Sequence, residues 1–167
     1  EKPSQGEITA VGPGAMCHSH LNVVDEADEV SIGIVAPDGR DGMIQHAAQF
    51  AAKGIPFIFD PGQGLPMFGG EDLKAFVEQA AWVTVNDYEW SLMADRTGWS
   101  EADVTRKTVA LVVTHGGEGS TVFTAGGKIA IPPAPARAVV DPTGCGDAYR
   151  AGILYGLMNG LPWEKTG

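Results

Sequence analysis

Short apolar segments alternate with longer amphipathic segments along most of the chain. The apolar segments have the length and composition of buried strands, and turn residues bound them. Four strands are predicted in this part, at residues 30–35, 56–60, 82–85 and 109–114. Four helices separate or follow them, at residues 41–53, 71–80, 86–93 and 100–107. This alternation predicts a doubly wound α/β fold, in which helices cover both faces of a mostly parallel sheet.

Both ends of the chain extend the same pattern. Further strands are predicted at residues 8–11, 121–124, 128–131 and 138–140, the middle two forming a hairpin around Ala125-Gly126-Gly127. A helix is predicted at residues 148–159, and another begins near Pro162. One such run of elements predicts a single domain over residues 1–167. Because the chain starts without Met and stops as a helix begins, we expect it to be truncated at both ends, as part of a longer protein.

Polar residues stand where the predicted strands end. Asp60, Asn86, Thr114 and Asp141 each end or directly follow a strand. In a parallel α/β sheet, ligands bind beyond the carboxyl ends of the strands. These side chains are therefore expected to share one rim of the sheet.

Composition narrows the choice of partners. The chain is 44% hydrophobic and 19% charged, with a formal net charge of −10 and a pI of about 4.6. An acidic protein lacks the basic face of a nucleic-acid interface, so any phosphate site has to be local. Two distant cysteines argue against a disulfide framework, and no long apolar run or signal peptide is present, which favours a cytoplasmic protein without membrane contact. Cys17-His18-Ser19-His20 offers at most three local zinc ligands, a minor alternative.

The stretch from Asp141 to Gly152 carries the strongest chemical signal. Its glycines form a turn that opens the predicted helix, and the first N–H groups of a helix, with the macrodipole, favour an anion such as phosphate. Asp147 has two interpretations. It can act as a general base beside a transferring phosphoryl group, or it can simply cap the helix, which Asp commonly does.

Two further patterns are weaker when taken alone. The glycines in the loop from Thr114 to Gly119 let the backbone approach a ligand, but such loops also form ordinary turns, and no Walker A sequence is present. Asn86 and Glu89 share a helix face, where they can bind a ligand or form a capping box.

Together these three patterns resemble the ribokinase (PfkB) family of sugar and nucleoside kinases, most of all bacterial adenosine kinase-type members. Residues 141–152 are similar to the C-terminal signature of that family, with Cys145 where Ala, Ser or Gly is usual and Tyr149 where Phe is common. The loop starting at Thr114 resembles its Thr-x-Gly-x-x-Gly nucleotide loop. Asn86 and Glu89 match its Asn-x-x-Glu motif.

The resemblance implies a ribokinase-like fold and ATP-dependent transfer of the γ-phosphoryl group to a hydroxyl of a nucleoside or sugar. It implies a general base at Asp147 and an anion hole formed by the amides of Gly144, Cys145 and Gly146. The implied ATP contacts are Thr114, Gly116 and Gly119.

The resemblance also implies metal sites. Asn86 and Glu89 match positions tied to Mg²⁺ and phosphate, and carboxylates that act through water suit this reluctantly dehydrated ion. Asp141 and Thr143 match positions that hold a monovalent cation, such as K⁺, in many members. These oxygen atoms can equally satisfy an Asx-type turn.

The resemblance covers roughly 60% of a typical member. The sugar-binding Gly-Gly-Asn region of the family has no counterpart here, and residues 1–10 resemble the tail of its lid hairpin, which can pair between subunits of a homodimer. The loop after Asp60 lacks the Arg and Asn of phosphosugar-specific members, which leaves nucleosides, with adenosine favoured, and plain sugars. The alternatives are a non-catalytic nucleotide-binding module and a flavodoxin-like binding domain.

Overall fold

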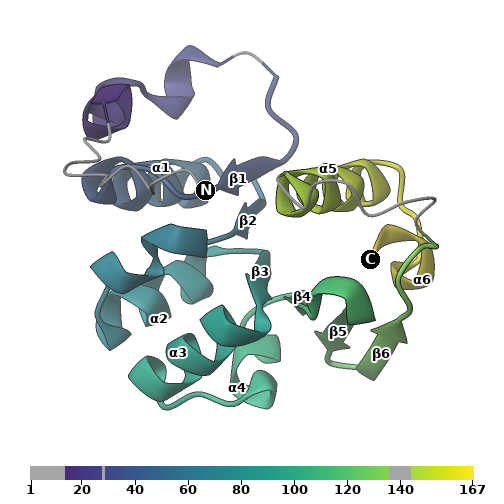
Figure 1. The fold of residues 1–167 in the computed structure, drawn as a ribbon. Coiled ribbons are helices and arrows are strands. Elements are labelled where there is room, and N and C mark those ends of the chain that lie inside the picture. Colours follow the sequence, from purple (N-terminus) through teal and green to yellow (C-terminus); the bar gives the residue numbers. More distant parts are fainter. Residues whose placement is uncertain (1–13, 28, 136–143) are drawn as a thin grey trace, which may run out of the picture.

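A computed structural model describes residues 14–27, 29–135 and 144–167 (Figure 1). Its centre is a six-stranded sheet whose strands are ordered as they occur in the chain. The strands are β1 (Gly33–Val35), β2 (Phe57–Phe59), β3 (Trp82–Asn86), β4 (Ala110–Thr114), β5 (Ser120–Thr124) and β6 (Gly127–Ile131). The first four are parallel, whereas β5 and β6 are antiparallel and form the predicted hairpin. The mostly parallel sheet is confirmed.

The predicted helices are present with small shifts at their ends. They are α1 (Arg40–Ala52), α2 (Gly70–Gln79), α3 (Asp87–Thr97), α4 (Glu101–Thr105), α5 (Cys145–Met158) and α6 (Trp163–Thr166). The largest shift concerns α3, which ends at Thr97 rather than at Met93. The helix α5 begins at Cys145, three residues before the predicted start, and therefore includes Asp147 in its first turn. Four 3₁₀ helices were not predicted, because they are short and lack a periodic pattern: η1 (Gly14–Leu21), η2 (Val24–Glu26), η3 (Gly62–Met67) and η4 (Gly116–Glu118).

Helices cover both faces of the sheet, because side chains along a strand alternate between the faces. Phe57 and Phe59 of β2 pack with α1 to α4, whereas Ile58 between them packs with α5. On the first face Phe59 stacks on Phe76 of α2, with ring centroids 4.4 Å apart and an interplanar angle of 7°. In Figure 1 the sheet accordingly separates α1 to α4 from α5 and α6. The prediction of helices on both faces is confirmed.

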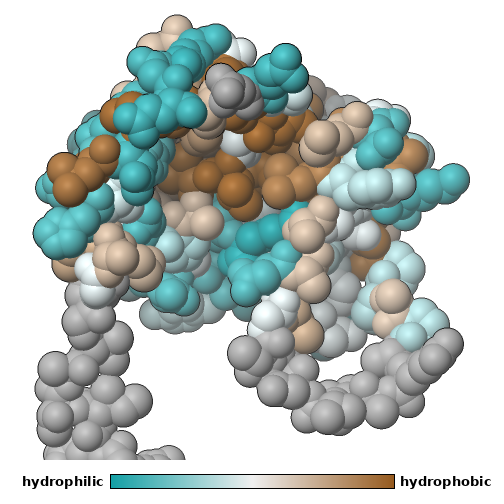
Figure 2. Space-filling view, turned by 90° about the horizontal axis from the view of Figure 1, so that it is seen from above, coloured by the Kyte–Doolittle hydropathy of each residue, from teal (hydrophilic) through white to brown (hydrophobic). Residues whose placement is uncertain are grey.

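The strand β1 forms one end of the described sheet, and its outer edge pairs with no described strand. Seen from above the view of Figure 1, the molecule has an apolar area between hydrophilic surfaces (Figure 2). An unpaired strand edge and an exposed apolar area are each features suited to further contacts.

Some expectations lie outside the described residues. The predicted strands at residues 8–11 and 138–140 do so, as do the lid-hairpin remnant, Asp141 and Thr143. Cys17 and Cys145 are both free and exposed, which agrees with the absence of a disulfide framework. Within the described ranges, no helix combines the length and the apolar character needed to cross a membrane.

Candidate active site

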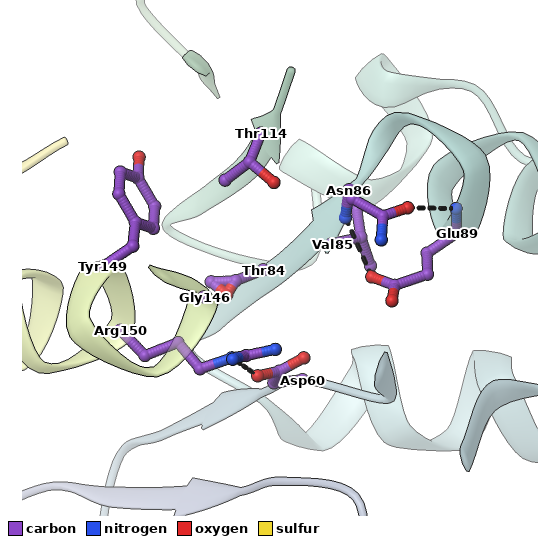
Figure 3. A pocket seen from close by; sticks show the side chains of 9 residues that line it. All are labelled: Asp60, Thr84, Val85, Asn86, Glu89, Thr114, Gly146, Tyr149 and Arg150. Atoms are coloured by element: carbon purple, nitrogen blue, oxygen red, sulfur yellow. Dashed lines mark hydrogen bonds and ion pairs between the residues drawn. The ribbon is translucent and has the colours of Figure 1, made fainter. Parts of the chain in front are cut away.

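A small cavity lies where the carboxyl ends of the central strands meet the start of α5 (Figure 3). Its lining comes from four parts of the chain and consists of Asp60, Thr84, Val85, Asn86, Glu89, Thr114, Gly146, Tyr149 and Arg150. Asn86 and Thr114 are paired neighbours at the ends of β3 and β4. Three of the four strand-end residues expected on one rim therefore line one cavity, and the fourth, Asp141, lies outside the described residues.

The N-terminus of α5 opens toward this cavity. Gly144 is the N-cap and has a left-handed conformation, φ 78° and ψ 0°, which strains any residue with a Cβ. The N–H of Ala148 donates the first helical bond to the carbonyl of Gly144, at 2.9 Å. Helix geometry leaves the amides of Cys145, Gly146 and Asp147 without a partner inside the helix, so they are available to an anion.

Asp147 lies in the first turn of α5, and its side chain is 87% exposed. The N-cap position belongs to Gly144, which has no side chain, so Asp147 is not the N-cap residue. An acid in the first turn also interacts favourably with the helix dipole, so this position suits a helix start as well as a catalytic role. The one interaction of Asp147 within the described part of the chain is with Arg150, one turn along the same helix.

Asn86 and Glu89 form the capping box at the start of α3. The N–H of Glu89 donates to Asn86 Oδ1, and the N–H of Asn86 donates to Glu89 Oε2, both at 2.8 Å. The capping box predicted for this pair is therefore present, but it does not exclude a binding role. The Asn86 amide nitrogen and the second Glu89 oxygen take no part in the box, and both residues line the cavity (Figure 3).

A second cavity, of about 350 Å³, lies beside the glycine-rich loop. It is bounded by Thr114, Gly116 and Gly119 on one side and by Cys145 and Gly146 of α5 on another, so the predicted nucleotide loop and anion hole face each other. Ile131, Pro132 and Pro133 add apolar walls. Gly119 has φ 96°, and a Cβ there would collide with the carbonyl oxygen of Ile131. A cavity of this size suits a small-molecule ligand with an apolar ring.

The two cavities share Thr114, Gly146 and Tyr149. The Tyr149 hydroxyl donates to Ser120 Oγ at 2.8 Å and ties α5 to β5. Burial raises the pKa of Tyr149 above its usual value near 10.0, against an opposing effect of the Ser120 hydrogen bond. The hydroxyl consequently remains a donor at neutral pH.

Sequence analysis gave no role to Arg150 and treated Asp60 only as a strand-end residue. Asp60 is 1% exposed, and Arg150 Nε forms an ion pair with its carboxylate (Figure 3). Burial lowers the pKa of the Arg150 guanidinium below its usual value. The spacing of Asp147 and Arg150, one helical turn apart, was the available signal for this network.

The zinc alternative at the N-terminal end finds no support. The described residues contain no group of three His, Cys, Asp or Glu side chains placed to hold a metal ion. His18 and His20 have ring centroids 6.4 Å apart, and Cys17 is exposed. The segment instead packs against α1, where Ser19 contacts the start of the helix.

Known proteins with similar sequences and structures are kinases. The pfkB family carbohydrate kinase profile matches residues 8–167. The nucleoside kinase of Methanocaldococcus jannaschii is 38% identical over 109 residues, which are 65% of this chain and 36% of that protein. A structure of Burkholderia thailandensis nucleoside kinase in complex with inosine has a TM-score of 0.91 and 48% identity, covering 95% of this chain and 53% of that one. A structure of the same enzyme in complex with ADP-inosine also matches, with a TM-score of 0.91.

This chain spans about a third to a half of the length of these relatives. The family match nevertheless extends over nearly the whole chain and includes every motif of the cavity described above. The chain belongs to the pfkB family of carbohydrate kinases.

Proposed function

We propose that this chain is part of a nucleoside kinase that transfers the γ-phosphoryl group of ATP to a hydroxyl of its acceptor. The observation that carries the proposal is the arrangement at the start of α5, where Gly146 lines the cavity of Asn86, Glu89 and Thr114 and the exposed Asp147 follows directly in the same helical turn. The larger cavity adjoins it along the glycine-rich loop and has room for the nucleotide. A nucleoside acceptor is supported by the relative solved with inosine and with ADP-inosine.

In the proposed reaction, Asp147 accepts the proton of the acceptor hydroxyl as its oxygen bonds to the γ-phosphorus. The bond from that phosphorus to the β–γ bridging oxygen breaks, and ADP leaves. The amides of Gly144, Cys145 and Gly146 stabilise the negative charge on the transferring group. Thr114, Gly116 and Gly119 hold the ATP phosphates. Phosphoryl transfer depends chiefly on such positioning and electrostatic stabilisation.

The Glu89 oxygen that the capping box leaves free fits a hydrated Mg²⁺, because this ion is commonly bound through few protein oxygens and several waters. The free amide group of Asn86 is a hydrogen-bond donor and suits a phosphate oxygen instead. Bound Mg²⁺ would supply positive charge to the ATP phosphates. Asp141 and Thr143 remain the predicted K⁺ site and lie outside the described residues.

Adenosine stays the favoured acceptor from sequence likeness, with inosine added by the relative's complexes. A cytoplasmic location and a homodimer formed through the lid hairpin likewise remain predictions. The second candidate, a nucleotide-binding module without turnover, keeps the larger cavity but needs no base.

The test is ADP release from Mg-ATP by the complete natural protein, with adenosine, inosine and ribose offered separately. We expect release that depends on a nucleoside and exceeds release with ribose. Tight Mg-ATP binding with no acceptor-dependent release would favour the binding module. Release stimulated best by ribose would contradict the nucleoside assignment.

Replacing Glu89 with glutamine separates its two roles. The glutamine carbonyl can still accept from the Asn86 N–H, so the thermal stability should change little, whereas loss of the charge should raise the Mg²⁺ concentration needed for half-maximal activity by about tenfold, the effect of roughly 1.4 kcal/mol. A Mg²⁺ titration of activity and a thermal melt measure the two effects.

The matched control is Asp103→Asn, in the capping box of α4, where Ser100 and Asp103 interact in the same way but line no described cavity. An unchanged Mg²⁺ requirement in Glu89→Gln would show that Glu89 serves the helix alone.

A further inference from the structure

We propose that Arg150 is a positioning residue for Asp147, and that the buried carboxylate of Asp60 anchors it. The inference rests on the proposed function, since it gives the general base a structural support. It begins with three charged side chains that link the sheet to the first turn of α5, in the order Asp60, Arg150, Asp147.

The anchor is Asp60, which directly follows β2 and is 1% exposed. A carboxylate this deeply buried is stable as an anion only when it is paired. Within the described part of the chain, Arg150 is its one charged partner, and neither carboxylate oxygen has a well-formed hydrogen bond there. The position of the arginine is therefore set by a fixed charge at the end of the sheet.

The other end of the guanidinium reaches Asp147. Arg150 Nη1 lies 3.1 Å from Asp147 Oδ1, while its Nε faces Asp60. Arginine can serve both carboxylates at once, because its planar fork presents several donors in fixed directions. Figure 3 shows the side chain extending from α5 toward Asp60 along the wall of the cavity.

Asp147 requires such support because, among the described residues, its side chain has no partner other than Arg150. It is 87% exposed, and a solvated carboxylate in a first helical turn samples several rotamers. A general base has to lie within hydrogen-bond reach of the proton that it accepts. Contact with an anchored guanidinium restricts Asp147 to orientations that face Arg150, which itself lines the cavity. The pair of Asp60 and Arg150 is neutral, so it supplies this restraint without changing the net charge beside the base.

The test is a double-mutant cycle on kcat and KM in the complete natural protein, with Mg-ATP and adenosine or inosine. Arg150→Met keeps much of the side-chain volume and removes the charge. We expect it to lower kcat by about 10- to 100-fold, the scale of a misplaced catalytic group, while both KM values stay within about threefold. In an Asp147→Asn background, the same change should lower kcat by less than about threefold, because there is no base left to position.

Two further variants address the anchor. Asp60→Asn should reduce kcat when Arg150 is present and have little added effect in Arg150→Met. Arg150→Lys should keep part of the function, because a single ammonium cannot hold both carboxylates in the geometry of the fork. Arg106→Met is the matched control, since Asp103 of α4 and Arg106 at its C-cap form an equally spaced pair away from both cavities.

The outcomes separate the explanations. Equal losses from Arg150→Met in both backgrounds would mean that Arg150 acts on the phosphates directly, which overturns the inference. An active wild type and an unaltered kcat in Arg150→Met would contradict this inference and leave the proposed function standing. If Arg150→Met lowers both kcat and the melting temperature, and the double variant Asp60→Asn/Arg150→Met restores both, the network has only a structural role. A wild type without acceptor-dependent ADP release would contradict the proposed function and this inference with it.

Discussion

Replacing Asp147 with asparagine is expected to lower kcat by a factor on the order of 10² to 10⁴, the usual contribution of a general base. Asparagine has nearly the same shape and can still accept from Arg150, so the local structure should persist. It cannot take the proton of the acceptor hydroxyl. Affinities for Mg-ATP and nucleoside should remain within a few-fold, because Asp147 is assigned to the transfer step rather than to ground-state binding. Steady-state kinetics and direct binding measurements check both parts.

A suitable control is Asp41→Asn, an exposed carboxylate in the first turn of α1 that lines neither cavity. It tests the effect of removing one negative charge from a helix start without touching the site. Less than a tenfold loss of kcat in Asp147→Asn, with unchanged affinities, would remove the proposed base.

The largest loss of stability is expected from Phe59→Ala. Phe59 is fully buried, stacks on Phe76 and lies in the core between the sheet and α2. Truncation removes buried apolar area and leaves a cavity, which typically lowers the free energy of unfolding by about 3–5 kcal/mol. Urea denaturation followed by tryptophan fluorescence measures the change.

The control is Tyr88→Ala, an aromatic side chain that is 72% exposed. Away from a core, such a change stays within about 0.5 kcal/mol. A loss below 1 kcal/mol for Phe59→Ala would contradict the packing described for this face of the sheet. Because Asp60 directly follows Phe59, a large loss should also be accompanied by reduced turnover in the protein that remains folded.

The fold could be predicted from sequence because its elements have strong local patterns. The strand at Ala110–Thr114 is a continuous apolar run, and the helix at Arg40–Ala52 has a clear period and a glycine end. The start of α5 was predicted three residues late, because Gly146 and Asp147 are poor helix formers in a helix interior, whereas here they lie in the first turn, where an acid is favourable. The 3₁₀ helix at Gly62–Met67 carries no periodic signal at all.

The candidate site divides in the same way. Asn86, Glu89, Thr114 and Gly146 could be placed in one cavity because their motifs follow strands that share a sheet edge. The pairing of Asp60 with Arg150 could not, because the two residues are distant in sequence and only the packing of α5 on the sheet brings them together. The bond between Tyr149 and Ser120 depends on the same packing.

Asn86 and Glu89 both start the helix α3 and line the candidate site, and this affects how inactive descendants of such a kinase would be recognised. Replacing either residue with one that cannot form its bond in the capping box weakens the start of α3, so folding alone would favour keeping the pair after catalysis had been lost. Asp147 carries no comparable folding role, since within the described part of the chain it contacts only Arg150. Among these positions, the presence of Asp147 therefore indicates an active enzyme, whereas the presence of the Asn-x-x-Glu motif indicates only that the fold is kept.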